Sequence, residues 1–218
     1  MTWLIDWNNP AVRSQIDVLV VDLETTGLKG YPDDLVVNVG VVGVNIINAN
    51  VIDVYDATIH YDTSMWTDRL KDSWIFSKGY MKLEDLEGGE DLYEVAKDLK
   101  RMAVTKPMTS YNLNFDFGRF LDWPPFELSR RSGARILRCL MKAAAQCPLI
   151  PRDRSHDDGK RCPKLETAYK ILCPDDPAQI GEEQRHLGLY DARMAGCILI
   201  PLLDMNYWNT WQRRTECD

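Results

Sequence analysis

Apolar residues near the N-terminus form a continuous run instead of alternating with polar ones. Residues 18–21 read Val-Leu-Val-Val, a β-branched segment typical of a strand that is buried on both faces. Two further β-rich stretches follow at residues 35–47 and 51–59, separated by Asn-Ala-Asn at residues 48–50. The three stretches therefore predict an antiparallel meander at the start of a sheet.

The rest of the chain combines helical spacing with short apolar runs. Apolar residues three and four positions apart predict helices at residues 91–102 and 191–203, and Pro163 suits the first position of another helix. Residues 106–111 and 135–140 read as short strands. We therefore expect an α/β fold: a mixed five-stranded sheet, with two parallel strands after the meander, flanked by helices.

The composition is that of an ordinary globular protein. With 218 residues, 45% of them apolar and 27% charged, the chain does not fit disordered or collagen-like classes. No apolar run approaches the ~20 residues that cross a bilayer, and the N-terminus lacks the pattern of a secretory signal. We expect a cytoplasmic protein with no membrane partner. Its domain would span residues 16–205, between an N-terminal extension (1–15) and an aromatic C-terminal tail (206–218).

The six cysteines show no close C-x-x-C pairing. A zinc site would need Cys147, His156, Cys162 and Cys173 to converge at spacings that match no common zinc motif. In a reducing compartment the simpler interpretation is that the cysteines are free thiols, buried or in loops.

The net charge of −7 at first argues against a nucleic-acid partner, because phosphate contacts need lysine and arginine. The distribution of the charges changes this picture. Residues 130–164 hold ten basic and three acidic side chains, a local charge of +7, so the rest of the chain carries −14. A basic stretch on an acidic body can guide a phosphate backbone, and a solvated loop is an equally good interpretation.

Two acids end the first buried strand. Asp22 and Glu24 lie two residues apart in Val-Val-Asp-Leu-Glu-Thr-Thr-Gly-Leu, so both side chains should point to one face. Carboxylates this close raise each other's pKa unless a cation lies between them, and carboxylate oxygens are the ligands that Mg²⁺ and Mn²⁺ prefer. A strand that simply leaves the core through a polar turn gives the same pattern, so the pair alone is not decisive.

Two further motifs follow along the chain. Asp116 comes four residues after Asn112, which ends a short strand and can cap the next helix. His186 lies five residues before Asp191, which opens the last helix. A loop histidine beside an acid can act as a general base near neutral pH. Each acid taken alone is equally a favourable residue for the first turn of a helix.

The order of the three motifs is more specific than any one of them. Asp-x-Glu on a strand, Asn-x-x-x-Asp at a strand-to-helix step and His-x-x-x-x-Asp at a helix start resemble the DEDDh subgroup of the DnaQ-like 3′–5′ exonuclease superfamily, which has the ribonuclease H-like fold. The resemblance covers residues 16–203. Leu187 stands where the sister subgroup has a tyrosine, which favours the histidine branch. Asn38 and Gly188 depart from the glutamate and alanine that are usual in relatives.

The resemblance implies a metal-dependent enzyme that releases nucleoside 5′-monophosphates from the 3′ end of DNA or RNA. Its catalytic residues would be Asp22, Glu24, Asp116, His186 and Asp191. The four acids would hold two Mg²⁺ or Mn²⁺ ions, and the histidine would take the proton of the attacking water. We expect a single-stranded nucleic-acid 3′ end as the partner. A homodimer, a polymerase partner, and a catalytically inactive module that binds nucleic acid or a polymerase stay open as alternatives.

Contacts to the substrate are expected around the same motifs. The expected contact residues are Thr25, Thr26, Gly27, Leu28, Asn112, Phe115, Arg152 and Arg154. The first four form the turn with which relatives bind the terminal nucleotide, although a tight turn that needs Gly27 explains the same residues. Asn112 is equally a helix cap, and Phe115 is equally a core residue. The two arginines would follow the substrate backbone.

Overall fold

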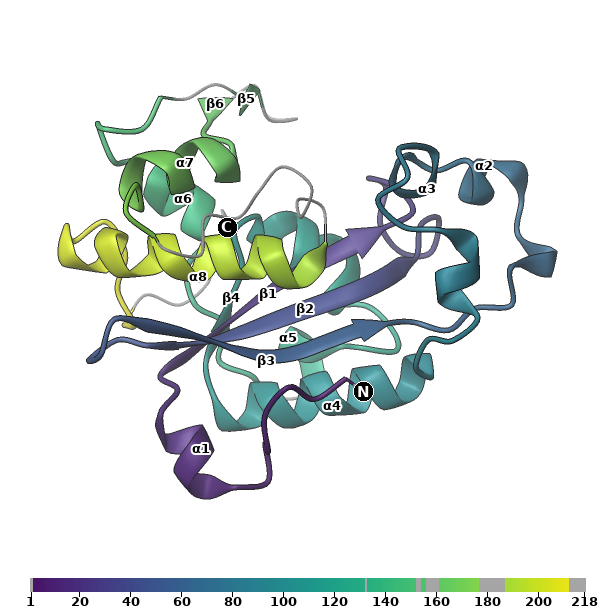
Figure 1. Cartoon of the computed structure of the whole chain (residues 1–218), viewed down its shortest axis with the longest axis horizontal. Helices are drawn as coiled ribbons and strands as arrows, with labels where there is room; N and C mark the ends of the chain where they lie inside the picture. The colour runs from purple at the N-terminus through teal and green to yellow at the C-terminus, as the bar shows by residue number, and fades with distance from the viewer. Residues whose placement is uncertain (1, 132, 152–153, 156–160, 177–186, 212–218) are drawn as a thin grey trace.

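The computed structural model describes residues 2–131, 133–151, 154–155, 161–176 and 187–211, and it has one main sheet between helices (Figure 1). In chain order the elements are α1 (Pro10–Ser14), β1 (Val18–Thr25), β2 (Val36–Asn45), β3 (Asn50–Thr58), η1 (Thr63–Met65), α2 (Asp68–Lys71), α3 (Trp74–Ser77), η2 (Leu83–Leu86), α4 (Leu92–Thr105), β4 (Met108–Thr109), η3 (Asn114–Leu121), α5 (Leu128–Arg131), α6 (Leu140–Ala144), β5 (Arg154–Ser155), β6 (Arg161–Cys162), α7 (Leu165–Leu172) and α8 (Gly188–Asp204).

The main sheet has four strands in the order β3-β2-β1-β4. β1 pairs antiparallel with β2 and parallel with β4, and β2 pairs antiparallel with β3. The predicted meander and the α/β fold class are therefore confirmed. Residues 18–21 of β1 are fully buried, as expected for a strand in the middle of a sheet that is covered on both faces.

The predicted fifth strand at residues 135–140 is reduced to a single bridge. Ile136 pairs parallel with Met108 of β4, and the Leu137 N–H donates to the Met108 carbonyl at 2.8 Å. The chain then enters α6, which ends the pairing. The sheet therefore has four strands and not five.

Helices cover both faces of the sheet. α8 crosses one face and contacts β1, β2 and β3, and α7 packs against α8 (Figure 1). α4 lies on the opposite face, where Val95, Leu99 and Met102 are buried along one side of the helix. The sheet is thus the middle of three layers, which explains why its central strands are almost entirely apolar.

Segments near both ends of the described chain pack on this domain. Trp3 forms an antiparallel bridge with Tyr55, so residues 2–4 cover part of the edge strand β3. Trp208, which follows α8, is fully buried, and its Nε1–H donates to the Arg138 carbonyl at 2.8 Å. The beginning of the aromatic tail therefore contributes to the core.

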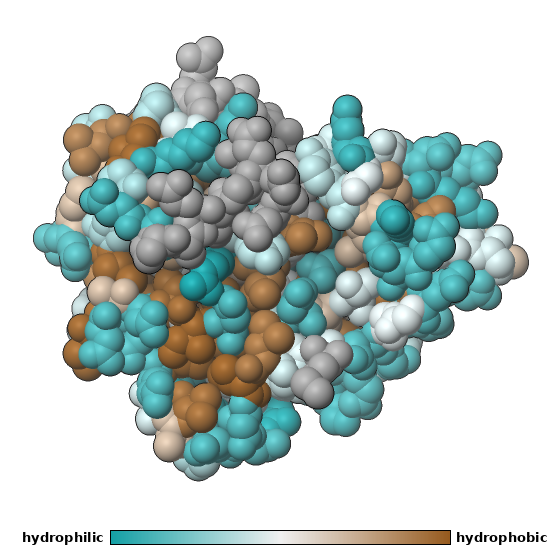
Figure 2. Space-filling model, viewed as in Figure 1, coloured by the Kyte–Doolittle hydropathy of each residue, from teal (hydrophilic) through white to brown (hydrophobic). Residues whose placement is uncertain are grey.

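Between β3 and α4 the chain leaves the sheet and forms a lobe, residues 59–91. The lobe contains η1, α2, α3 and η2, and it has its own small cluster of buried side chains around Ile75, Met81 and Leu86. Figure 1 shows the lobe on the side of the molecule toward which β1 runs, and Figure 2 shows its surface as mainly hydrophilic. The lobe therefore flanks the end of the sheet where the strand acids lie.

The described helices include none that is long and apolar enough to cross a membrane. The five cysteines in the described part of the chain are free, and Cys139, Cys147 and Cys162 are buried. Among the described residues, the one cluster of three or more potential metal ligands consists of carboxylates. The described cysteines therefore form no zinc site, and His156 lies outside the described residues.

Candidate active site

Asp22 and Glu24 lie at the end of β1, where the strand leaves the core. The alternation of side chains along a strand puts both carboxylates on one face. In the ladder between β1 and β2, Asp22 pairs with Gly40 and Glu24 pairs with Asn38. Glu24 is buried and Asp22 is partly buried. Two acids therefore face the helical layer at the edge of a hydrophobic core.

The last helix brings a third carboxylate to this pair. α8 begins at Gly188, so Asp191 lies in its first turn. One oxygen atom from each of Asp22, Glu24 and Asp191 lies within 4.8 Å of the other two. The structure thus brings together acids from the first strand and the last helix of the fold.

α8 approaches the sheet more closely than side chains would normally permit. A Cβ on Gly40 would lie 2.0 Å from the Leu189 nitrogen, and one on Gly188 would lie 2.6 Å from Asn38 Oδ1. Only glycine fits where two backbones come this close. Because Gly40 is the cross-strand partner of Asp22, this contact brings the first turn of α8 to the level of the strand acids.

Asp116 comes from the segment that follows β4. This strand is parallel to β1, so the chain leaves both strands at the same edge of the sheet. Asp116 lies in η3, a π-helix, which is a rare conformation that is frequent at functional sites. Its side chain is buried, and its Oδ2 atom has no hydrogen-bond partner among the described residues. Asp116 is not one of the three acids within 4.8 Å, but its charge raises the pKa values of Asp22 and Glu24.

Burial and mutual repulsion raise the pKa values of these acids. Burial raises the pKa of Asp22 and that of Glu24 well above the usual range, and the charges of Asp116 and Asp191 raise both further. Burial also raises the pKa of Asp116 to about 7, although the Ser110 hydroxyl lowers it and Asp191 adds to it. The four carboxylates therefore cannot all ionise without cost unless positive charge is bound among them.

This set of donors fits a hard divalent cation. The candidate ligands are all carboxylate oxygens, which Mg²⁺ and Mn²⁺ prefer to nitrogen or sulfur. A buried polar atom without a partner, such as Asp116 Oδ2, costs free energy unless another group or an ion binds it. The residues present therefore suit Mg²⁺ or Mn²⁺.

The turn after β1 is held by its own hydrogen bonds. Thr25 Oγ1 donates to the Gly27 carbonyl at 2.8 Å, and the buried Thr26 Oγ1 accepts from the Leu35 N–H at 2.9 Å. Leu28, in contrast, is 66% exposed. Both hydroxyls thus support the shape of the turn, and Leu28 is its exposed apolar side chain.

Asp34 also holds this turn, although no sequence pattern singles it out. Its buried carboxylate accepts the Lys29 N–H at 2.8 Å and lies 2.5 Å from Nη1 of Arg69 in the lobe. A Cβ on Gly27 would lie 2.6 Å from the same carboxylate, and the φ of Gly27 is not positive. The glycine therefore allows a close approach and does not serve a left-handed backbone. In the sequence, Pro32-Asp33-Asp34 reads only as a polar turn.

Asn112 and Phe115 lie beside Asp116 along the chain. The Asn112 carbonyl accepts the Asp116 N–H at 3.0 Å, whereas its side-chain Oδ1 is buried and has no hydrogen-bond partner in the part of the chain that the structure describes. The N-cap position of η3 is Leu113, so the side chain of Asn112 does not cap this helix. Phe115 is partly buried, and its ring meets the Phe120 ring edge-on at 5.3 Å, as in a core contact.

Three predicted site residues have no described side chain. Arg152 and His186 lie outside the described residues, and Arg154 is described only by its backbone, in the two-stranded pair of β5 and β6. In the sequence, His186 comes one residue before Leu187, which occupies the N-cap position of α8. The roles of these three residues stay predictions.

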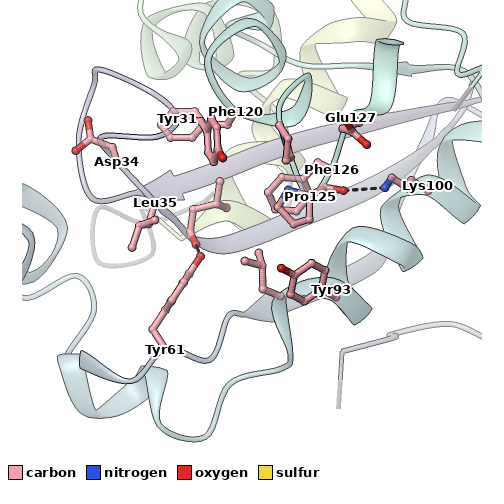
Figure 3. Close-up of a pocket in the computed structure, with 13 residues that line it drawn as sticks. Tyr31, Asp34, Leu35, Tyr61, Tyr93, Lys100, Phe120, Pro125, Phe126 and Glu127 are labelled. Carbon is pink, nitrogen blue, oxygen red and sulfur yellow. Dashed lines mark hydrogen bonds between the residues drawn. The ribbon is translucent and has the colours of Figure 1, made fainter. Parts of the chain in front are cut away.

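A separate cavity of about 440 Å³ lies between the loop after the turn, α4 and residues 124–127 (Figure 3). Figure 3 shows Lys100 of α4 donating to the Pro125 carbonyl, a bond of 2.7 Å. None of the four acids lines this cavity, whose walls are mostly aromatic and aliphatic. The lining residues are Tyr31, Asp34, Leu35, Val36, Tyr61, Leu92, Tyr93, Lys100, Phe120, Pro124, Pro125, Phe126 and Glu127.

Comparison with solved structures matches most of the chain to nucleases. A full-length 3′-exonuclease superposes with a TM-score of 0.61 at 15% identity, over 92% of this chain and 90% of the other. The nuclease domain of 3′hExo, described as a DEDDh family member and bound to rAMP, has a TM-score of 0.60 at 14% identity, over 93% and 98% of the two chains. The chain has the fold of a 3′-exonuclease.

Escherichia coli exonuclease I in complex with a dT13 oligonucleotide is also similar, with a TM-score of 0.56 at 18% identity. The similarity covers 86% of this chain and 40% of the other. No family model and no curated protein sequence matches the chain. The resemblance to the DnaQ-like DEDDh exonucleases is thus confirmed at the level of the ribonuclease H-like fold.

Proposed function

We propose that the protein is a metal-dependent 3′–5′ exonuclease of the DEDDh type, which hydrolyses the terminal phosphodiester bond of DNA or RNA and releases a nucleoside 5′-monophosphate. The observation that carries this proposal is the convergence of Asp22, Glu24 and Asp191, beside the buried Asp116, whose charge raises the pKa values of Asp22 and Glu24. The chain order of these acids is that of the DEDDh motifs. The 3′-exonuclease fold is a second, independent support.

The four acids would hold the metal ions. Asp22, Glu24 and Asp191 offer three oxygens that already converge, and Asp116 offers a buried oxygen that no hydrogen bond from a described residue uses. Divalent ions bound here supply charge neutralisation and Lewis-acid activation of water. The carboxylates stay in place for this work because β1, α8 and η3 are anchored in the core.

Groups around the acids would handle the proton and the terminal nucleotide. His186 would accept the proton of the attacking water, a role that typically contributes about 10²–10⁴-fold in rate. Leu28 would pack against the terminal base, from a turn whose shape Thr25 and Thr26 support. The proposed reaction thus needs His186 and the turn after β1 in addition to the four carboxylates.

The partner that we propose is the 3′ end of a nucleic acid, single-stranded where it enters the site. Arg152 and Arg154, from the segment with a charge of +7, would contact its phosphates. Structures of similar fold concern rAMP, a dT13 oligonucleotide and a histone mRNA stem-loop. Proteins of this fold therefore include binders of both sugar types.

Digestion of end-labelled strands tests this proposal. Single-stranded DNA and RNA of one sequence, labelled at the 5′ end, are incubated with Mn²⁺ and separated by size. We expect a ladder that shortens from the 3′ end, that EDTA abolishes and that the Asp116→Ala variant does not produce. Asp175→Ala is the matched control because Asp175 is an exposed acid outside the cluster, and it should leave the ladder unchanged.

Two results would contradict the proposal. Binding of the labelled strand with no cleavage in Mn²⁺ would identify an inactive nucleic-acid-binding module. Cleavage that persists in EDTA or in Asp116→Ala would show that the carboxylates are not responsible. The relative rates on DNA and RNA report the sugar preference, which depends on contacts to the 2′-hydroxyl.

A further inference from the structure

The N-cap residue of α8 gives the first turn of this helix no side-chain hydrogen bond. Leu187 occupies the N-cap position, and its apolar side chain cannot accept a hydrogen bond. The Gly188 N–H instead donates to Oδ1 of Asn38, in the middle of the sheet, at 3.2 Å. Asn38 thus satisfies one of the free N–H groups at the start of α8, as an N-cap residue does within its own helix.

Asn38 is itself held in one orientation. Its Nδ2 donates to Asp56 Oδ1 in β3 at 3.0 Å, which leaves Oδ1 as the acceptor for the Gly188 N–H. Asn38 is buried and lies directly across the ladder from Glu24. A chain of hydrogen bonds therefore runs from the edge strand, past one metal-site acid, to the first residue of α8.

Gly188 is enclosed by these groups. A Cβ on Gly188 would lie 2.6 Å from Asn38 Oδ1 and 3.2 Å from the Asp22 carbonyl oxygen. Asp191 follows within the same helical turn, and each residue of an α-helix advances it by about 1.5 Å. Because both residues lie in the first turn of α8, a displacement of the helix backbone at Gly188 would also displace the carboxylate of Asp191.

We infer that Asn38 is a positioning residue of the metal site: by holding the Gly188 N–H, it sets the first turn of α8 and so places the carboxylate of Asp191 opposite Asp22 and Glu24. The inference rests on the proposed function, because it takes Asp191 to be a metal ligand. Asn38 acts through α8 and needs no contact with metal or nucleic acid. Its loss should therefore weaken metal binding and loosen the start of α8 together.

Two measurements on the full chain test this role. Hydrogen exchange at the Gly188 amide is measured in EDTA, and Mn²⁺ binding is followed by the electron paramagnetic resonance of the free ion. In Asn38→Ala we expect exchange at Gly188 to accelerate about tenfold or more and Mn²⁺ affinity to fall about 10–100-fold. Asn45→Ala removes an amide from the same strand that donates to the Gln15 carbonyl, and it should change neither quantity.

An exchange of two side chains separates this hydrogen-bond role from a general loss of packing. Asn38→Asp alone places a carboxylate against Asp56, and the repulsion should speed exchange at Gly188 and weaken Mn²⁺ binding. Adding Asp56→Asn restores a donor–acceptor pair of reversed direction, and a carboxylate oxygen still accepts the Gly188 N–H. The double variant should therefore regain slow exchange and bind Mn²⁺ within a few-fold of the wild-type protein.

The outcomes distinguish this inference from the proposed function. Unchanged exchange at Gly188 or unchanged Mn²⁺ affinity in Asn38→Ala would overturn the inference, and so would a double variant no better than Asn38→Asp. In each of these cases the wild-type protein still binds Mn²⁺, and the proposed function stands. A wild-type protein that fails to bind Mn²⁺ would overturn both.

Discussion

Gly188 of α8 lies directly on Gly40 of β2: a Cβ on Gly188 would stand 2.9 Å from the Gly40 nitrogen. The two backbones meet with no side chain between them. Asp22 is the cross-strand partner of Gly40, so the contact lies at the level of the carboxylate cluster. The glycine contact therefore fixes the distance between α8 and the sheet at the same place where Asp191 approaches Asp22 and Glu24.

Replacing Gly40 with alanine should push α8 away from the sheet. The new methyl group would meet the Leu189 nitrogen at 2.0 Å, and a backbone atom cannot rotate away. We expect the free energy of unfolding to fall by about 1–3 kcal/mol, and Mn²⁺ to bind more weakly because Asp191 moves with the helix. Urea unfolding of the metal-free protein and an Mn²⁺ titration measure these two effects.

Gly88→Ala is the control for this substitution. A Cβ at Gly88 meets no atom within 4 Å, so we expect a change within about 0.5 kcal/mol. If Gly40→Ala were as stable as Gly88→Ala, the backbone contact between α8 and β2 would be refuted.

The metal-free protein should become less stable as the pH rises through the range in which Asp116 titrates. The ordinary pKa of this carboxyl is 3.8, and burial raises it to about 7 in the folded protein. Between these values the folded state binds more protons than the unfolded state, so the free energy of unfolding falls with rising pH. Once the pH exceeds 7, the free energy of unfolding is lower than at acid pH by on the order of 4 kcal/mol for this group alone.

Asp116→Asn removes this titration. In EDTA the variant should therefore lose less stability than the wild-type protein between about pH 4 and about pH 8, as measured by urea unfolding. Mg²⁺ added at the higher pH should restore the wild-type protein and have little effect at the lower pH, where protons compete for the carboxylates. The same pH slope in both proteins would argue against a buried, protonated Asp116.

Arg69 should matter for the turn that we propose to hold the terminal nucleotide. Its guanidinium lies 2.5 Å from the buried Asp34 carboxylate, which in turn accepts the Lys29 N–H. Arg69→Gln leaves that carboxylate without its cation, so we expect a loss of about 1.5–3 kcal/mol in the free energy of unfolding. We also expect KM for a labelled strand to rise several-fold with kcat nearly unchanged, because the carboxylate cluster is untouched.

Lys97→Gln is the comparison for Arg69→Gln. It breaks an exposed ion pair with Glu94 on α4, which should contribute between about 0 and 1 kcal/mol. Steady-state kinetics and urea unfolding of both variants test the difference. A fall in kcat with unchanged KM in Arg69→Gln would mean that the lobe acts on the chemistry and not on the turn.

The meander and α8 could be predicted because their signals are local. The run of residues 18–21 and the helical spacing of residues 191–203 each describe the surroundings of one element. Residues 135–140 have an equally β-like sequence, yet only Ile136 forms a bridge. How far a short segment pairs depends on where the chain turns next, and the composition of the segment does not contain this information.

The candidate site, too, was predictable from the sequence in part and depended on the tertiary structure for the rest. The sequence by itself determined which acids are present, their order, and that Asp22 and Glu24 share a face, because residues two apart on a strand point to the same side. Only the tertiary structure decided that Asp191 reaches them, because α8 starts where Gly188 packs against Gly40 and where the Gly188 N–H donates to Asn38 Oδ1. How closely a helix approaches a sheet is a property of the two packed surfaces together, and no local pattern in either segment specifies it.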